Sequence, residues 1–298
     1  MTNDCIEKFD KIIPFTLKKS KVRGRFVKLD KSLNTILKRH NYEISISLPL
    51  ADILCTSCCI GSLLKFNGFF TIQGSSKDTL KTILAEYSSE GNIRGYAGYD
   101  TKKTILEKDK LNLDQLMSKG HLAFTAIESK SNKRYQGIIP VQNGNFSNSI
   151  DYYFKNSEQI NSEIICLSDF SDNNYISAAI LIQCTPDENN VFNDDHSVFE
   201  EAKLFLNSIK KTELLSRNIS IEDLLYKLFH SLDVRVLEEI KVKDKCRCSF
   251  ERVKNTLSNI SESELSDITF SDGSLDIKCE FCKKLTSLSK EDLYSIRK

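Results

Sequence analysis

The sequence predicts an α+β fold in three parts: a mixed α/β core domain at residues 1–186, a helical linker at 187–242 and a small four-cysteine domain at 243–298. Three observations support this prediction. Short alternating runs of apolar and polar residues, separated by glycines, dominate the first part. Helical periodicity follows, and two close cysteine pairs lie near the C-terminus. A chain of 298 residues is also too long for one small core.

Within the core domain, hydrophobic periodicity assigns most of the elements. Val22–Asp30 alternates as a strand does, and Ser32–Arg39 has helical spacing. The mostly apolar run from Pro49 through Phe66 is long enough for a buried helix. A short helix is expected at Asp151–Ser157. Further strands are expected at Phe69–Gln73, Leu80–Tyr87, Ile93–Tyr99, His121–Glu128, Arg134–Val141, Glu163–Leu167 and Tyr175–Cys184.

The predicted linker contains amphipathic helices. A turn cluster at Pro186–Asn190 marks its boundary with the core, and Ser220 is placed to cap its second helix. Isolated helices of this length are marginal in water, so their apolar faces need a surface to pack against. These faces comprise Val198, Phe199, Ala202, Phe205, Leu206 and Ile209, and then Ile221, Leu224, Leu225 and Leu228.

The C-terminal domain is expected to hold two short helices and a strand. Ser249 can cap a helix through Leu257, and Ser261 with Glu264 fits a capping box. A turn at Ser271–Ser274 then leads into a short strand that ends at the third cysteine of the domain.

Two cysteine pairs carry most of the functional information. Cys246 and Cys248 form a C-x-C pair, and 30 residues later Cys279 and Cys282 form a C-x-x-C pair. Four thiolates at this spacing can close a tetrahedral zinc site with no open position for substrate, so we expect a structural or regulatory zinc. The same sulfurs could instead close two local disulfides and act as a redox switch. Unrelated thiols are the remaining alternative, although two such pairs rarely coincide.

Composition and charge narrow the function classes. The net charge is +1, and the C-terminal domain has 11 basic and 10 acidic residues, so neither nucleic acid nor a membrane surface is an expected partner. The short basic run from Lys18 to Arg25 is interpreted as a solvated entry to the first strand. We find no targeting segment and no uninterrupted apolar stretch of about 18 residues. Ten cysteines without a secretion signal favour a reducing cytoplasm.

The remaining cysteines and the histidines are interpreted as ordinary packing or surface residues. Cys55, Cys58 and Cys59 lie in the apolar run, where a free thiol behaves as a small hydrophobe. Cys166 and Cys184 fall in strands, and Cys5 is terminal. No nucleophile–base arrangement or phosphate loop is present in the sequence, so we expect no enzymatic activity. The histidines, which form no cluster, are His40, His121, His196 and His230.

Several motifs along the chain belong together: Val22–Val27, Leu64–Gly68, Arg94–Ala97, Arg134–Gly137, Tyr153–Gln159, Asp272–Gly273 and Cys279–Cys282. With the order C-x-C then C-x-x-C, which is the most diagnostic feature, they resemble the heat-shock protein 33 family, the redox-regulated holdase chaperones of bacteria. The turn Gly74–Lys77 and the segment His40–Glu43 depart from the family pattern.

The resemblance implies an ATP-independent holdase that oxidative stress activates. Its zinc ligands would be Cys246, Cys248, Cys279 and Cys282. Oxidation would form Cys246–Cys248 and Cys279–Cys282 disulfides, expel zinc and unfold a metastable linker. The protein would then dimerise, hold unfolding clients and pass them to an ATP-driven foldase in the cytoplasm. Our own hypothesis is that the released linker contacts clients through Phe199, Phe205, Leu206, Leu225 and Phe229, which could equally be packing residues.

Two other function classes stay open from the sequence. A dithiol–disulfide oxidoreductase would use Cys279 as its attacking thiol, although a thioredoxin-like βαβ context is missing around it. A zinc-dependent nucleic-acid-binding protein would use the same four cysteines, against the balanced charge of the domain.

Overall fold

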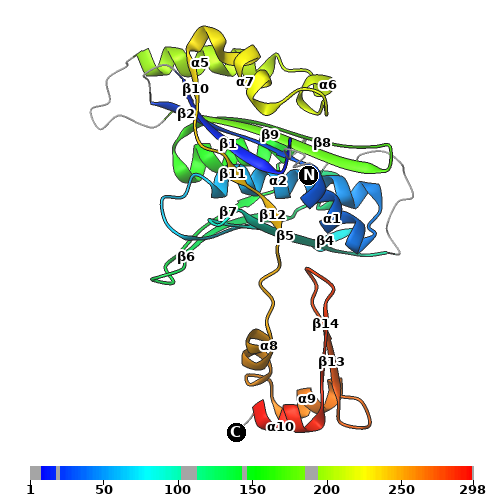
Figure 1. The fold of residues 1–298 in the computed structure, drawn as a ribbon. Coiled ribbons are helices and arrows are strands. Elements are labelled where there is room, and N and C mark those ends of the chain that lie inside the picture. The colour runs from blue at the N-terminus through cyan, green and yellow to red at the C-terminus, as the bar shows by residue number, and fades with distance from the viewer. Residues whose placement is uncertain (1–7, 18–20, 102–112, 143–145, 185–193, 297–298) are drawn as a thin grey trace, which may run out of the picture. The chain divides into compact units, whose positions relative to one another are not determined.

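The computed structural model describes residues 8–17, 21–101, 113–142, 146–184 and 194–296, and it divides the chain into two compact units after Asp244 (Figure 1). The α+β prediction is confirmed, because sheets and helices occur in both units. The sequence-based boundaries at residues 186 and 242 stay predictions. The turn cluster Pro186–Asn190 and Cys5 lie outside the described residues.

The first unit contains two six-stranded sheets. In one, which we call sheet A, the strand order is β10-β1-β2-β9-β8, and β11 also pairs with β1. The pairs are antiparallel, with Phe26 opposite both Ile13 and Ile180. The strands of sheet A are β1 (Lys11–Leu17), β2 (Val22–Leu29), β8 (Asn161–Ser171), β9 (Asn174–Cys184), β10 (Val234–Val236) and β11 (Ile240–Lys241).

The second sheet, sheet B, has the order β12-β5-β4-β3-β6-β7. The edge strand β12 pairs parallel to β5 and ends at Asp244, two residues before Cys246. The strands of sheet B are β3 (Gly68–Ser75), β4 (Leu80–Ser88), β5 (Asn92–Tyr99), β6 (His121–Glu128), β7 (Arg134–Pro140) and β12 (Lys243–Asp244).

Helix α2 (Ile44–Gly61) lies between the two sheets and forms the centre of the core (Figure 1). It is long and apolar enough to cross a membrane, but 94% of it is buried inside the protein, as a core helix requires. The helix begins five residues before Pro49 and ends at Gly61, so the predicted run was placed too late. The other elements of this layer are α1 (Lys31–His40), α3 (Leu113–Leu116), α4 (Phe146–Tyr153) and the π-helical turn η1 (Phe154–Glu158).

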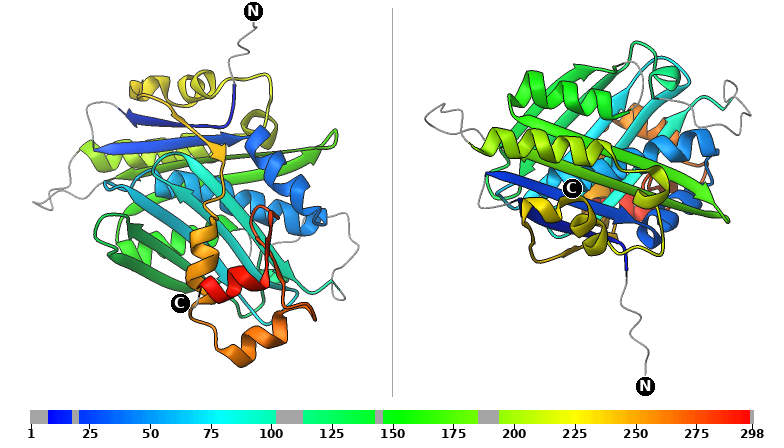
Figure 2. Two further views of the ribbon diagram at one scale, coloured as in Figure 1. Left: turned by 60° about the horizontal axis from the view of Figure 1, so that its bottom comes forward. Right: turned by 90° about the horizontal axis from the view of Figure 1, so that it is seen from above.

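The opposite face of sheet A is covered by the helices of the predicted linker (Figure 1 and Figure 2). Ser220 caps α7, as predicted, by accepting a hydrogen bond from the Asp223 amide. Beyond these helices the chain returns to sheet A as β10 and β11. The elements are α5 (Asp194–Asn207), α6 (Lys211–Leu214), α7 (Ile221–Phe229) and the 3₁₀ turn η2 (His230–Leu232).

The second unit is small and holds the four-cysteine segment. The predicted caps are confirmed: Ser249 accepts from the Arg252 amide, and Ser261 and Glu264 form a reciprocal capping box. A two-stranded sheet pairs β13 with β14 in antiparallel register. Its elements are α8 (Phe250–Leu257), α9 (Glu262–Ile268), β13 (Leu275–Lys278), β14 (Leu285–Leu288) and α10 (Lys290–Ile296).

Most predicted strands of the core are confirmed, and β1 was missed. Val22 therefore begins the second strand of the described chain, so the basic run does not enter the first strand as predicted. Pro14 lies inside β1 and breaks the alternation that would have revealed it. Its carbonyl accepts from the Leu237 amide at 2.8 Å, in the gap between the pairings of β10 and β11. The strand thus tolerates a residue that has no N–H to donate.

Candidate metal centre

The four predicted ligands lie on two loops of the small unit. Cys246 and Cys248 occupy the extended segment just before the Ser249 cap of α8. Cys279 and Cys282 lie in the turn between β13 and β14, which closes through a hydrogen bond from the Lys283 amide to the Cys279 carbonyl at 2.8 Å. The pairing of β13 with β14 therefore holds the second pair at the end of a hairpin.

The sulfurs of the four cysteines lie within 4.8 Å of one another. The Sγ atoms of Cys246 and Cys279 are 3.8 Å apart, and those of Cys248 and Cys282 are 3.4 Å apart. A tetrahedron with Zn–S bonds of about 2.3 Å has edges of about 3.8 Å. A disulfide would need about 2.0 Å, and none joins the nine cysteines that the structure describes. The group is thus positioned to bind a metal ion, and its donor set fits zinc.

The local environment makes the thiols unequal. Burial, followed by the neighbouring thiols of Cys282 and Cys246, raises the pKa of Cys248 to about 12. Burial also raises the pKa of Cys282. Burial acts in the same direction on Cys279, but hydrogen bonds from the amides of Cys282 and Phe281 and from nearby thiols outweigh it, so the pKa of Cys279 is lowered. Because a metal binds thiolates, metal binding here must release protons and weaken as pH falls.

The small unit has little else to hold it folded. Its buried apolar side chains number only five among the described residues. A core of this size supplies too little hydrophobic stabilisation for an independent domain. Structural zinc contributes about 10–16 kcal/mol, which exceeds the whole stability of many domains. The five residues are Leu257, Leu275, Leu288, Leu293 and Ile296.

Comparisons with known proteins agree with this geometry. A family model described as Hsp33 protein matches residues 10–288. The chain belongs to the Hsp33 family. A relative named 33 kDa chaperonin, from Vibrio vulnificus (strain YJ016), is 30% identical over 272 residues, which are 91% of this chain and 90% of that protein. Another of that name, from Proteus mirabilis (strain HI4320), is 27% identical over 299 residues and covers 98% of each chain. Membership supports a chaperone role.

A solved structure shares the fold of this Hsp33 family member. The crystal structure of the 33 kDa chaperonin from Thermotoga maritima, described as a heat shock protein 33 homologue, matches with a TM-score of 0.82. The match covers 97% of this chain and 98% of that one at 21% sequence identity, which establishes the common fold.

The other described cysteines of this Hsp33 family member are packing residues. Cys55, Cys58 and Cys59 are fully buried in α2, and burial raises the pKa of each. Cys166 is buried on β8, and Cys184 is half-buried on β9. No histidine of the described chain belongs to a cluster that could hold a metal ion. The four C-terminal cysteines therefore stand alone as the candidate metal centre of the described residues.

The candidate client-binding side chains form a closed face in this Hsp33 family member. Phe229 stacks on Phe15 of β1 with ring centroids 5.6 Å apart. The surface predicted to contact clients is thus covered by sheet A in this conformation. Phe199, Leu206, Leu225 and Phe229 are buried in the cluster between the helices and sheet A, and Phe205 packs against it half-buried.

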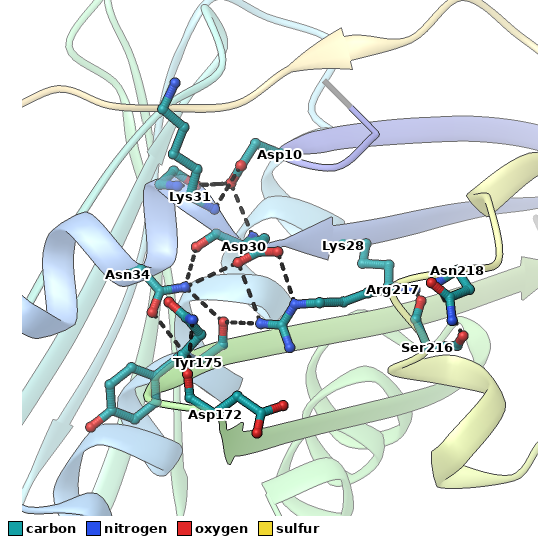
Figure 3. Close-up of polar contacts among 12 residues, drawn as sticks. Asp10, Lys28, Asp30, Lys31, Asn34, Asp172, Tyr175, Ser216, Arg217 and Asn218 are labelled. Atoms are coloured by element: carbon teal, nitrogen blue, oxygen red, sulfur yellow. Dashed lines mark hydrogen bonds and ion pairs between the residues drawn. The ribbon is translucent and has the colours of Figure 1, made fainter. Parts of the chain in front are cut away.

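Polar contacts that the sequence did not reveal also hold these helices on sheet A (Figure 3). Arg217, in the loop between α6 and α7, pairs with Asp30 at 3.2 Å and donates to the Tyr175 carbonyl at 3.2 Å. Asn34 binds the same two groups, at 3.1 Å and 2.7 Å. One guanidinium thus joins the loop to the ends of two core elements.

A second contact beside it involves a buried lysine. Lys28, on β2, donates to the Ser216 carbonyl and lies over the Phe9 ring at 4.6 Å from its centroid. Burial, followed by the charge of Arg217, lowers the pKa of Lys28 to about 8. Lys11 adds an ion pair to Glu222 of α7 at 2.8 Å. Nothing in the sequence signals these contacts, because they join residues about 190 to 210 positions apart.

Proposed function

We propose that this protein is a redox-regulated, ATP-independent holdase that binds unfolding proteins under oxidative stress. The observation that carries the proposal is the gathering of four thiols in a unit with a five-residue core. In the reduced state Cys246, Cys248, Cys279 and Cys282 hold one zinc ion, which keeps that unit folded. The metal has a regulatory role, and the protein acts in the cytoplasm without catalysing a reaction.

Activation would begin with oxidation of the thiols by hydrogen peroxide. Two thiolates form one S–S bond and lose two electrons, and the O–O bond of one hydrogen peroxide breaks to give two waters after it takes up two protons. Two such steps produce Cys246–Cys248 and Cys279–Cys282 disulfides, as the family resemblance implies. The oxidised sulfurs no longer bind zinc. None of the four sulfurs lies at the disulfide bond length of about 2.0 Å from another, so side-chain movement must accompany local pairing.

The consequence is release of the helical segment. The chain runs from sheet A through β11 and β12 into the four-cysteine loop, so when the small unit unfolds the linker would lose the folded segment that follows it in the chain. The released helices would expose their apolar face. That face would hold clients, or a second copy in the active homodimer, until an ATP-driven foldase takes the clients over. Contact through Phe199, Phe205, Leu206, Leu225 and Phe229 remains our proposal.

The test compares zinc-loaded reduced protein with peroxide-treated protein in suppressing thermal aggregation of a client enzyme. The proposal requires suppression by the oxidised form alone, with zinc appearing in solution as activity rises. Equal suppression by both forms would leave zinc a purely structural role. No suppression by either form would overturn the holdase assignment.

One observation favours the oxidoreductase alternative enough to test it. The pKa of Cys279 is lowered, as in an attacking thiol. Catalytic turnover in an insulin-reduction assay by the zinc-free reduced protein would support that activity. Stoichiometric oxidation without turnover is the result that our proposal predicts.

A further inference from the structure

A cavity of about 700 Å³ opens in the first unit, and its described lining includes no cysteine and none of the residues of the linker helices. Three sequence motifs that the metal centre does not use converge on it. They are the segment Leu64–Gly68 before β3, the β7 segment Arg134–Gly137, and Tyr153–Gln159 around η1, and each contributes residues to the cavity wall. The helix α4 that leads into η1 packs beside β7 (Figure 2).

Two polar side chains of sheet A reach this cavity together. Arg23 on β2 and Gln183 on β9 are directly opposite in the strand register, so both point to the same face of the sheet. Gln183 is 99% buried, and its Nε2 donates to Ser162 Oγ at 3.2 Å. Its Oε1 and the Nε of Arg23 are buried and have no hydrogen-bond partner among the described residues. Such groups carry a large desolvation cost unless a ligand or water satisfies them.

The charges around the cavity favour an anion. Arg23 supplies the first guanidinium of its lining. Arg134 adds a second guanidinium to the lining. The carboxylate of Glu158 also lines the cavity, but it already accepts a hydrogen bond from the Tyr153 hydroxyl. Two guanidiniums therefore face one carboxylate that already has a donor.

The remaining wall is largely apolar and rich in aromatic rings. Tyr153 stacks on Phe124 with centroids 4.1 Å apart, and Tyr135 at the rim tilts over Phe66 at 6.4 Å. Gly137 makes room for this wall, because a Cβ there would lie 2.7 Å from the Tyr153 ring. Tyr135 is 59% exposed, so its ring is available to cover an incoming apolar group. The cavity thus combines a polar floor with apolar walls, the composition typical of small-ligand sites.

We propose that this cavity binds the carboxylate end of an acylated apolar amino acid, with Arg23 on the carboxylate and Gln183 on the amide. The buried acceptor Oε1 of Gln183 needs an N–H donor, the buried Nε of Arg23 needs an acceptor that a carboxylate supplies best, and the apolar walls need an apolar side chain. An N-acyl amino acid carries these three groups on neighbouring atoms. A free metabolite of this class and the C-terminal residue of a polypeptide share the same chemistry. The site is independent of thiol oxidation and of client holding.

The test titrates reduced, zinc-loaded protein by calorimetry with N-acetylphenylalanine and two matched analogues. Its C-terminal amide lacks the carboxylate, and O-acetylphenyllactate replaces the N–H with oxygen. We expect the C-terminal amide analogue to bind at least about tenfold more weakly than N-acetylphenylalanine, since a charge-assisted hydrogen bond is lost. The ester analogue should also lose affinity. A short peptide ending in free phenylalanine distinguishes the sources: binding points to chain ends, and failure points to a free acyl amino acid.

Variants then assign the contacts. Arg23→Gln should remove the preference for N-acetylphenylalanine over its C-terminal amide. Gln183→Met should remove the preference for N-acetylphenylalanine over the ester analogue O-acetylphenyllactate. Arg235→Gln, at an exposed arginine of β10 in the same sheet, is the matched control and should keep both preferences. Equal affinity of the native protein for all three ligands, or no binding by any of them, overturns the proposal without relying on a variant. An Arg23→Gln protein that folds and keeps the carboxylate preference also overturns it.

Discussion

Replacing Arg217 with alanine should loosen the helical segment without touching the thiols or the proposed client-binding face. The change removes the ion pair to Asp30 and the hydrogen bond to the Tyr175 carbonyl. Asn34 still binds both groups, so neither is left unpaired. Since the Arg217 side chain is 34% exposed, the ion pair contributes at most about 1 kcal/mol, and the charged hydrogen bond adds about 1–2 kcal/mol. A loss of about 2 kcal/mol corresponds to about 30-fold in the equilibrium between docked and released helices.

Hydrogen exchange on the reduced, zinc-loaded protein measures this equilibrium. The amides of α7 should lose about 30-fold in protection, because exchange there requires the helices to leave sheet A. The variant should also gain holdase activity at a lower peroxide dose. Zinc content should stay unchanged, because Arg217 lies outside the four-cysteine unit.

Lys227→Ala is the matched control. Lys227 pairs with Glu213, and both residues lie within the helical segment itself, so the loss of this pair does not weaken docking on the sheet. Unchanged α7 protection in a correctly folded Arg217→Ala protein would refute the role of the Arg217 contacts. Equal effects of the two substitutions would refute it as well.

The remaining predictions concern the metal centre, the buried lysine and the covered face. Cys248→Ser should lose zinc, measured as metal content, and its small unit should unfold, measured by NMR. Cys184→Ser should keep both the zinc and the folded unit. A zinc-loaded Cys248→Ser protein would contradict the four-thiolate site. Burial lowers the pKa of Lys28 to about 8, so between pH 8 and about 10.5 the unfolded chain binds more protons than the native protein. The free energy of unfolding should therefore increase with pH across this range in the native sequence, compared with Lys28→Met. The same pH dependence of the unfolding free energy in both proteins would disprove the pKa shift. Phe229→Ala should destabilise the first unit by about 3–5 kcal/mol in urea, because its ring is fully buried against Phe15; a loss below about 1 kcal/mol would mean that the face is already loose.

Local sequence patterns predicted much of the fold. Strands such as β4 and β9 have strong alternation or apolar runs, and the caps at Ser249 and Ser261 are fixed by side chains within four residues. Three of the missed strands depend on tertiary contacts. The strands β10, β11 and β12 have only two or three residues each and exist through pairing with β1 and β5.

The same distinction applies to the site. The spacing of Cys246, Cys248, Cys279 and Cys282 predicted a cluster, because each pair is local and a short folded stretch can bring the pairs together. The partners of Arg217 and Lys28 could not be predicted, since the fold alone brings them together. Nor could the opposition of Arg23 and Gln183, which follows from the register of β2 on β9.

The central claim is that thiol oxidation, metal loss and client holding are one event. A peroxide titration of the zinc-loaded protein, with free thiols, released zinc and aggregation suppression measured in the same samples, tests it most directly. The account predicts that the three signals rise or fall together, with four thiols lost for each zinc released. Full suppression before any zinc is released, or complete zinc release without suppression, would contradict it.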